Sequence, residues 1–202
     1  CINKGRIGAY LATKACISSK KNKIILSPFT IFDVVNMVIC AGGVPVFSDV
    51  EKQSITIDLD SIKKVYDDEV AGILITHTHL INTDIERIVN FSKKNNIFLI
   101  EDCSQSAGAK FKNRFLGSFG EFGCFSFFPT KNLSCIGDGG AITFNNSKYL
   151  KKLIALREYG WDNKRNLEYV GINSRLDEIH AGFLNTKLPY LNTDNNKRRK
   201  IA

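Results

Sequence analysis

The sequence predicts an α/β fold in which a mostly parallel sheet lies between two layers of helices. Short apolar runs alternate with helical patterns along the whole chain, which is typical of layered α/β domains. Several runs, such as residues 97–100, are continuously apolar, as expected of strands that are covered by helices on both faces. A length of 202 residues, 44% of them hydrophobic, is enough for one large domain with a substantial core.

The expected elements alternate in chain order. The expected strands are residues 23–27, 45–48, 72–76, 98–101, 123–127 and 140–144. The expected helices are residues 6–18, 31–41, 58–66, 84–95, 147–159 and 175–188. Asp58 and Ser147 are placed to cap two helix N-termini, and Gly42-Gly43 to end a third helix. After Pro189 the pattern turns polar, so we expect one large domain over residues 1–190 and the start of a small domain at 191–202.

Composition and charge exclude several classes of protein. No apolar run approaches the length of a membrane span, so we expect none. The net charge of +8 would suit a nucleic-acid partner, but the lysines are scattered and only residues 197–200 form a dense basic cluster. Since that cluster ends a helical pattern, where cations suit the helix dipole, we expect no nucleic-acid partner. The six cysteines show no paired spacing, which favours a reducing, cytoplasmic location.

Two short patterns suggest sites that we reject. The glycines of residues 117–123 precede an expected strand, whereas the glycines of a dinucleotide-binding loop must follow one. His77 and His79 lie on one face at a strand end, but His180 is far away and no acidic cluster completes a ligand set. We therefore expect no metal site.

Polar groups converge where two expected strands end. Asp102 follows the strand 98–101, and Ser126 and Lys131 come at the end of the strand 123–127. Ligands of open α/β sheets bind beyond the carboxyl ends of strands, so these three side chains are candidates for one site. The apolar residues 127–129 would partly desolvate Lys131, which suits a nucleophilic amine. Taken alone, however, a lysine after a strand is most often a solvated turn residue.

Longer motifs carry a resemblance to a known family. Residues 100–109 read IEDCSQSAGA, and residues 117–142 read GSFGEFGCFSFFPTKNLSCIGDGGAI. Further agreement lies in residues 29–50 and in GINSRLDEIHAG at 171–182. In these sequence motifs the chain resembles the DegT/StrS-type nucleotide-sugar aminotransferases, which are pyridoxal-phosphate enzymes of fold type I in the aspartate aminotransferase superfamily. Family members are longer, and the chain begins at Cys1, so we expect it to lack the first segment and most of the small domain.

The resemblance implies a role for each matching residue. Lys131 matches the lysine that holds pyridoxal 5'-phosphate as an internal aldimine. Asp102 matches the carboxylate paired with the pyridinium nitrogen, which keeps the ring an electron sink. Gln105 matches a residue near the ring hydroxyl, and Ser126 a hydroxyl that binds the cofactor phosphate. Asn173 matches an asparagine that reaches the phosphate from a neighbouring subunit, which implies a homodimer with shared active sites.

The chain departs from the family pattern near the cofactor. The turn that usually reads GT or SAT is Gly5-Arg6-Ile7-Gly8, where helix amides can still bind phosphate and Arg6 adds charge. We therefore include Arg6 and Ile7 among the expected cofactor-binding residues. Ile31 stands where an aromatic residue usually stacks on the ring, so either Phe32 covers the ring or an aliphatic face suffices.

The function that the resemblance implies is transfer of an amino group from an amino acid, with glutamate expected, to a keto-sugar nucleotide in cell-surface or secondary-metabolite sugar biosynthesis. The family segment HLYGQPAD is shortened at residues 79–84, so we expect the substrate side to differ there. One alternative is a pyridoxal-phosphate sugar dehydratase, whose relatives carry histidine where Lys131 stands. The other is a catalytically inactive regulatory or binding protein on the same fold.

Overall fold

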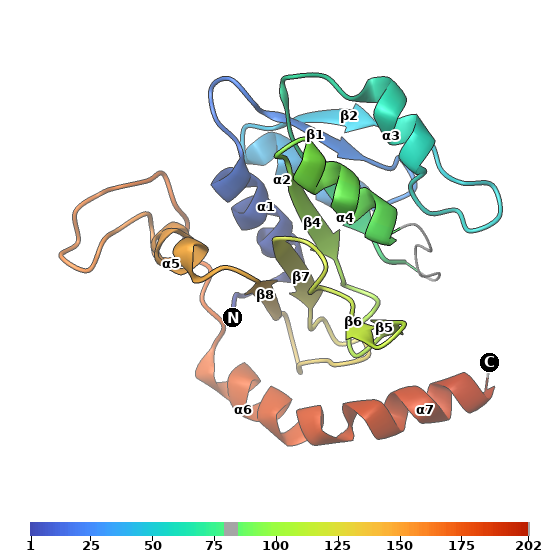
Figure 1. Ribbon diagram of the computed structural model, residues 1–202. Coiled ribbons are helices and arrows are strands. Elements are labelled where there is room, and N and C mark those ends of the chain that lie inside the picture. Colours follow the sequence, from blue (N-terminus) through green and yellow to red (C-terminus); the bar gives the residue numbers. More distant parts are fainter. Residues whose placement is uncertain (79–84, 202) are drawn as a thin grey trace.

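The computed structural model describes residues 1–78 and 85–201, which form a sheet between two helical layers (Figure 1). The six strands of the sheet have the order β2-β1-β3-β4-β7-β8. Neighbours are parallel except for β7 and β8. In chain order the strands are β1 Lys23–Leu26, β2 Val44–Phe47, β3 Val70–Thr76, β4 Phe98–Asp102, β7 Phe122–Ser126 and β8 Gly140–Phe144. The predicted mostly parallel sheet is confirmed.

The helices cover both faces of the sheet. Successive side chains of a strand point to opposite faces, so the apolar strands have apolar surface on each face for helices to bury. They are α1 Gly5–Cys16, α2 Phe32–Cys40, α3 Leu59–Val65, α4 Ile85–Lys94, α5 Leu150–Arg157, α6 Glu178–Lys187 and α7 Leu191–Ile201. Ile24, Leu74 and Ile100 join the core under α1, α2 and α5. Ile25 and Leu99, each one residue away from these, join the core under α3 and α4. The predicted three layers are therefore present.

Several boundaries depend on local capping. Asp58 caps α3 as predicted, since its carboxylate accepts a hydrogen bond from the Ser61 amide at 2.7 Å. Gly42 has a φ of 89°, which places the left-handed turn that glycine favours directly after α2. The prediction that Ser147 caps a helix is wrong. The side chain of Asn146 instead accepts from the Lys148 amide and opens a short 3-10 turn, Ser147–Tyr149, that leads into α5.

One element was not predicted, and a second was expected only as a helical pattern that ends at residues 197–200. A small antiparallel hairpin, β5 Lys110–Phe111 and β6 Arg114–Phe115, lies between β4 and β7 in the chain. The polar segment after Pro189 forms the helix α7, which follows α6 and the 3-10 turn Leu188–Tyr190 along one side of the molecule (Figure 1). None of the helices in the described part of the chain combines the length and the apolar content that a membrane crossing needs.

Candidate active site

Asp102 and Glu101 are adjacent in β4 but serve opposite faces of the sheet. Asp102 is the last residue of the strand, and the register places it beside Thr76 of β3 and Cys124 of β7. Like Ile100, it faces the layer that contains α1 and α2, whereas Glu101 shares the opposite face with Leu99. The alternation therefore directs one carboxylate toward the first turns of α1.

A cavity of about 150 Å³ opens at this edge of the sheet, between the ends of β4 and β7 and the starts of α1 and α2. Its lining residues are Lys4, Gly5, Arg6, Ala9, Ile31, Val34, Asp102, Ser104, Ser126, Phe128, Lys131 and Asp138. Of the residues predicted from the sequence, Asp102, Ser126, Lys131 and Arg6 come together here. Lys131 follows a turn in which its amide donates to the Phe128 carbonyl at 2.9 Å.

Asp102 is a buried carboxylate, with 5% of its surface exposed. Burial raises its pKa, against hydrogen bonds from Ser104 that favour the charged form. The Ser104 amide and hydroxyl both donate to Oδ1, at 3.0 and 2.6 Å, which leaves Oδ2 for a cationic partner. A protonated ring nitrogen fits this need, because a buried carboxylate is stabilised by a neighbouring positive charge. No helix starts at Asp102, so it is not a helix cap.

The start of α1 lies directly against the end of β7. A Cβ on Gly5 would fall 2.5 Å from the Cβ of Ser126, so only glycine permits this approach. The Ser126 Oγ accepts a weak hydrogen bond from the Phe128 amide at 3.4 Å, and its proton remains available to donate. Helix amides and a hydroxyl at one cavity wall suit a phosphate group. The cavity therefore offers groups for both ends of a pyridoxal phosphate.

The remaining predicted residues at the starts of α1 and α2 differ in whether they line the cavity. Arg6 lines the cavity, but its guanidinium also forms an ion pair of 2.6 Å with Asp33. Ile7 does not line the cavity; it packs against the apolar core beneath α1. Ile31, 60% exposed, lines the cavity, while Phe32, 75% exposed, does not. Of these two side chains, the aliphatic one is therefore the one at the cavity.

Two predicted residues lie outside this cavity. Gln105 is exposed and lines a neighbouring cavity instead. Asn173 is exposed and forms an isolated antiparallel bridge with Glu158. Because α6 begins at Glu178, later than predicted, Asn173 does not cap this helix. The predicted difference at residues 79–84, and with it His79, falls outside the described residues.

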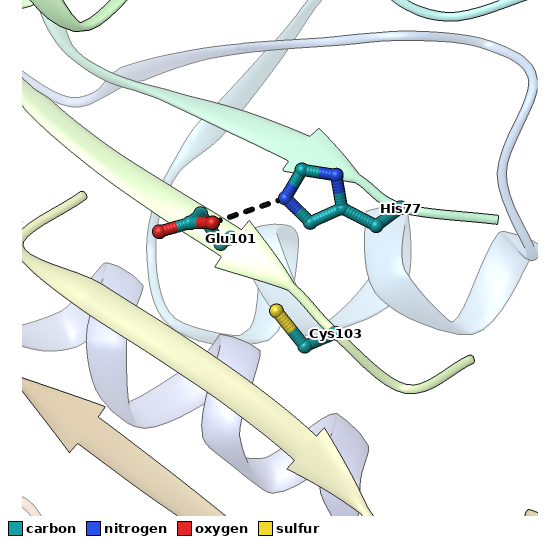
Figure 2. A group of neighbouring side chains, drawn as sticks. All are labelled: His77, Glu101 and Cys103. Atoms are coloured by element: carbon teal, nitrogen blue, oxygen red, sulfur yellow. Dashed lines mark hydrogen bonds and ion pairs between the residues drawn. The ribbon is translucent and has the colours of Figure 1, made fainter. Parts of the chain in front are cut away.

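Glu101, on the opposite face of the end of β4, binds the loop of residues 117–120. It is fully buried, and its oxygens accept hydrogen bonds from the amides of Gly117, Phe119 and Gly120 at 2.7 to 2.8 Å. The His77 Nε2 lies 3.1 Å from Oε2, and since a carboxylate only accepts, Nε2 carries the proton (Figure 2). The glycines rejected above as a nucleotide loop thus supply amides to a buried anion.

Cys103 lies beside this pair, so that His77, Glu101 and Cys103 could in principle hold a metal ion (Figure 2). Burial raises the pKa of the Cys103 thiol well above its ordinary value, which disfavours the thiolate that binds metals. Both carboxylate oxygens are already engaged by backbone amides. The donor set therefore suits a structural hydrogen-bond cluster better than a metal.

Replacing Glu101 with Gln should lower the free energy of unfolding by about 3 kcal/mol at pH 7. The NH2 group of glutamine is a donor, and it would face the buried backbone N–H donors that the carboxylate now accepts from. Burial alone raises the pKa of Glu101, but His77 and the Gly120 and Gly117 amides outweigh it and hold the pKa below the ordinary 4.5. Such a group stabilises the fold above pH 4.5, and the stabilisation is lost as the pH falls through the lowered pKa.

The difference in unfolding free energy between wild type and variant should therefore narrow as the pH falls from 4.5 through the lowered pKa of Glu101. Urea unfolding at a series of pH values measures it. Glu86→Gln is the matched control, since Glu86 is exposed and pairs with Lys112 at 2.6 Å. An equal loss of stability in both variants would contradict the role of Glu101.

Sequence reasoning missed two contributors to the cavity. Asp138 lines the cavity and pairs with Lys4 at 3.0 Å. Ser104 orients the Asp102 carboxylate. The serine could have been found, because a residue two positions after an aspartate often donates to it in a turn. The pairing of Asp138 with Lys4 joins residues too distant in sequence to be inferred.

The chain resembles known proteins in both sequence and fold. The profile of the DegT/DnrJ/EryC1/StrS aminotransferase family matches residues 2–202. The chain belongs to this family. Its members use pyridoxal 5'-phosphate, so the cofactor predicted from the sequence is confirmed at the level of the family.

Individual relatives support this assignment. The chain is 33% identical over 198 residues to the UDP-N-acetyl-3-dehydro-alpha-D-glucosamine 3-aminotransferase of Acidithiobacillus ferrooxidans, covering 98% of this chain and 54% of the relative. It is 28% identical to the dTDP-3-amino-3,4,6-trideoxy-alpha-D-glucose transaminase of Streptomyces venezuelae, covering 100% and 53%. The crystal structure of an aminotransferase from Psychrobacter cryohalolentis superposes with a TM-score of 0.87 at 29% identity, covering 94% and 51%. The chain thus has the predicted fold type I and spans about half the length of these relatives.

Proposed function

We propose that this chain is the cofactor-binding part of a pyridoxal-phosphate aminotransferase that moves an amino group from an amino acid, with glutamate expected, to a keto-sugar nucleotide. The observation that carries the proposal is the meeting of Asp102, Ser126, Lys131 and the start of α1 at one cavity. Two named relatives act on amino sugars attached to nucleotides, which supports the substrate class. The presence of Lys131 favours amino transfer over the dehydratase alternative.

Each residue has a role in this proposal. The cofactor, when bound, supplies an electron sink for proton removal at the donor carbon. Lys131 would hold the cofactor and then move the proton as a general base. Asp102 would keep the ring nitrogen protonated, and Ser126 with the α1 amides would bind the phosphate. Ile31 would cover one side of the ring, and Gln105 would act near the ring hydroxyl.

Organisation and location belong to the same proposal. Residues 1–190 would form the large cofactor-binding domain, and residues 191–202 would begin a small domain. A cytoplasmic location is supported by the cysteines, all six of which are free thiols. Cys16, Cys103 and Cys124 are buried within the core, where thiols act as small apolar groups.

Adding glutamate to the cofactor-loaded chain tests the proposal. We expect the visible absorbance of the bound cofactor to fall as 2-oxoglutarate appears in equal amount, because the first half of amino transfer needs no sugar. Other amino acids serve as comparison donors. A chain that binds the cofactor firmly but converts no amino acid would favour the inactive alternative.

We also propose a homodimer in which Asn173 of one chain reaches the cofactor phosphate of the other. Asn173 is exposed and so available to a neighbouring chain. The segments on either side of it carry exposed apolar side chains, Val170 and Ile179, which would be covered in a dimer. An amide donor suits a phosphate that is already partly neutralised by helix amides.

Mixing Lys131→Ala chains with Asn173→Ala chains tests the shared site. Each parent dimer lacks one group at both sites, whereas a mixed dimer would contain one intact site and recover activity. Differently tagged chains allow the mixed species to be isolated and its dimeric state measured. Isolated mixed dimers that remain as inactive as the parents would show that the sites are not shared.

A further inference from the structure

A second cavity, of about 360 Å³, lies beside the cofactor cavity. Its lining residues are His77, Thr78, Gln105, Ser106, Ala107, Ala109, Lys110, Leu116, Asn132, Asn195, Arg198 and Arg199. The two cavities are neighbours along two loops: Ser104 and Lys131 line the first, and the next residues, Gln105 and Asn132, line the second. A molecule in the second cavity would therefore contact residues that directly follow those lining the first.

The walls of this second cavity carry positive charge without compensation. Among the described residues, three cationic side chains line it, and no aspartate or glutamate does. Lys110 lies 4.3 Å from the centre of the Phe115 ring, and Arg199 donates to the Asn196 side chain. Across the described ranges, 1–78 and 85–201, none of the three cations forms an ion pair with a carboxylate. Such a site favours an anion.

The position of α7 in this wall is held by a buried side chain. Asn195 accepts a hydrogen bond from the Asn132 amide group at 3.0 Å and donates to the Ala107 carbonyl at 3.0 Å. Its Oδ1 also lies 3.4 Å from Nη1 of Arg198. The helix is thus tied to the loop that carries Lys131, and the arginines of its next turn, although exposed, line the cavity.

Neutral polar groups complete the wall. Thr78 and Gln105 bring a hydroxyl and an amide. His77 is buried, and its Nδ1 has no hydrogen-bond partner in the part of the chain that is described. Figure 2 shows this nitrogen on the side of the ring away from Glu101. An unpaired buried nitrogen is costly, and a ligand group or water at the cavity would satisfy it.

We propose that this second cavity binds the oxyanion of a substrate, either a carboxylate of the amino donor or the diphosphate of the sugar nucleotide. The inference rests on the proposed function, because that function supplies both anions. Arginine pairs with carboxylates and phosphates through two parallel hydrogen bonds, so Arg198 and Arg199 would make the main contacts. Lys110 would add a third charge from the β5–β6 hairpin.

Calorimetric titration of the cofactor-loaded chain tests this, with L-glutamate and inorganic pyrophosphate as separate probes. We expect the double variant Arg198→Gln/Arg199→Gln to bind one of the two probes about tenfold or more weakly. Lys110→Gln should weaken the binding of the same probe. Because Lys110 lies on a different element, this result would show that the loss does not come from a disturbed α7. The probe that responds identifies the source of the anion.

Lys197→Gln is the matched control, because Lys197 lies on the same helix, pairs with Asp194 at 3.7 Å and does not line the cavity. Its affinity for both probes should remain unchanged. Equal affinities in all variants, or no binding of either probe to the wild type, would overturn the proposal. The visible absorbance of the cofactor, recorded in the same samples, separates this outcome from a failure to bind the cofactor at all.

Discussion

Replacing Lys131 with Ala should reduce amino transfer by about 10,000-fold or more, because one side chain would both hold the cofactor and move the proton. The effect should be chemical rather than structural. Lys131 lies in a loop after β7, partly exposed, and the core beneath that loop is formed by other side chains such as Phe127 and Leu133. The cofactor-free variant should therefore unfold at the same urea concentration as the wild type.

Borohydride reduction of the cofactor-loaded wild type, followed by peptide mass mapping, measures the attachment directly. The pyridoxyl label should be found on Lys131 and be absent from the Lys131→Ala variant. Lys112→Ala is the control, since Lys112 is exposed and pairs with Glu86. A label on Lys110 or Lys112 would refute the assignment of Lys131.

Replacing Asp102 with Asn should reduce amino transfer by about 100- to 1,000-fold while some cofactor binding remains, because the ring nitrogen would lose its buried anionic partner. Asparagine keeps an oxygen that can accept both hydrogen bonds from Ser104, so the local turn should survive. Asp138→Asn is the matched control. Asp138 lines the same cavity, but its side chain is 45% exposed and pairs with Lys4.

The stability of the cofactor-free variant separates this role from a structural one. Burial raises the pKa of Asp102 in the folded chain, so the folded state loses stability as the pH rises from about 4 through that raised pKa. Asn cannot ionise, and the variant should be as stable as the wild type at pH 4 and more stable at pH 7. A capping role for Asp102 would instead cost about 1 kcal/mol. Near-normal turnover in Asp102→Asn would contradict the catalytic role.

The fold class could be predicted from the sequence because the patterns that mark its strands and helices are local. Continuous apolar runs mark strands buried on both faces, and the order of strands and helices restricts how they can be layered. Boundaries depend on single hydrogen bonds, which is why Asn146 rather than Ser147 begins the turn before α5. The hairpin Lys110–Phe115 was missed because its two-residue strands are too short to show an alternation.

The sequence by itself determined that Asp102, Ser126 and Lys131 lie at one edge of the sheet. Residues at the carboxyl ends of neighbouring parallel strands must share such an edge. Only the tertiary structure decided which neighbours complete the site. It placed Ile31 rather than Phe32 at the cavity and Gln105 in a second one. These outcomes depend on how side chains distant in sequence pack against each other, and no local pattern encodes that packing.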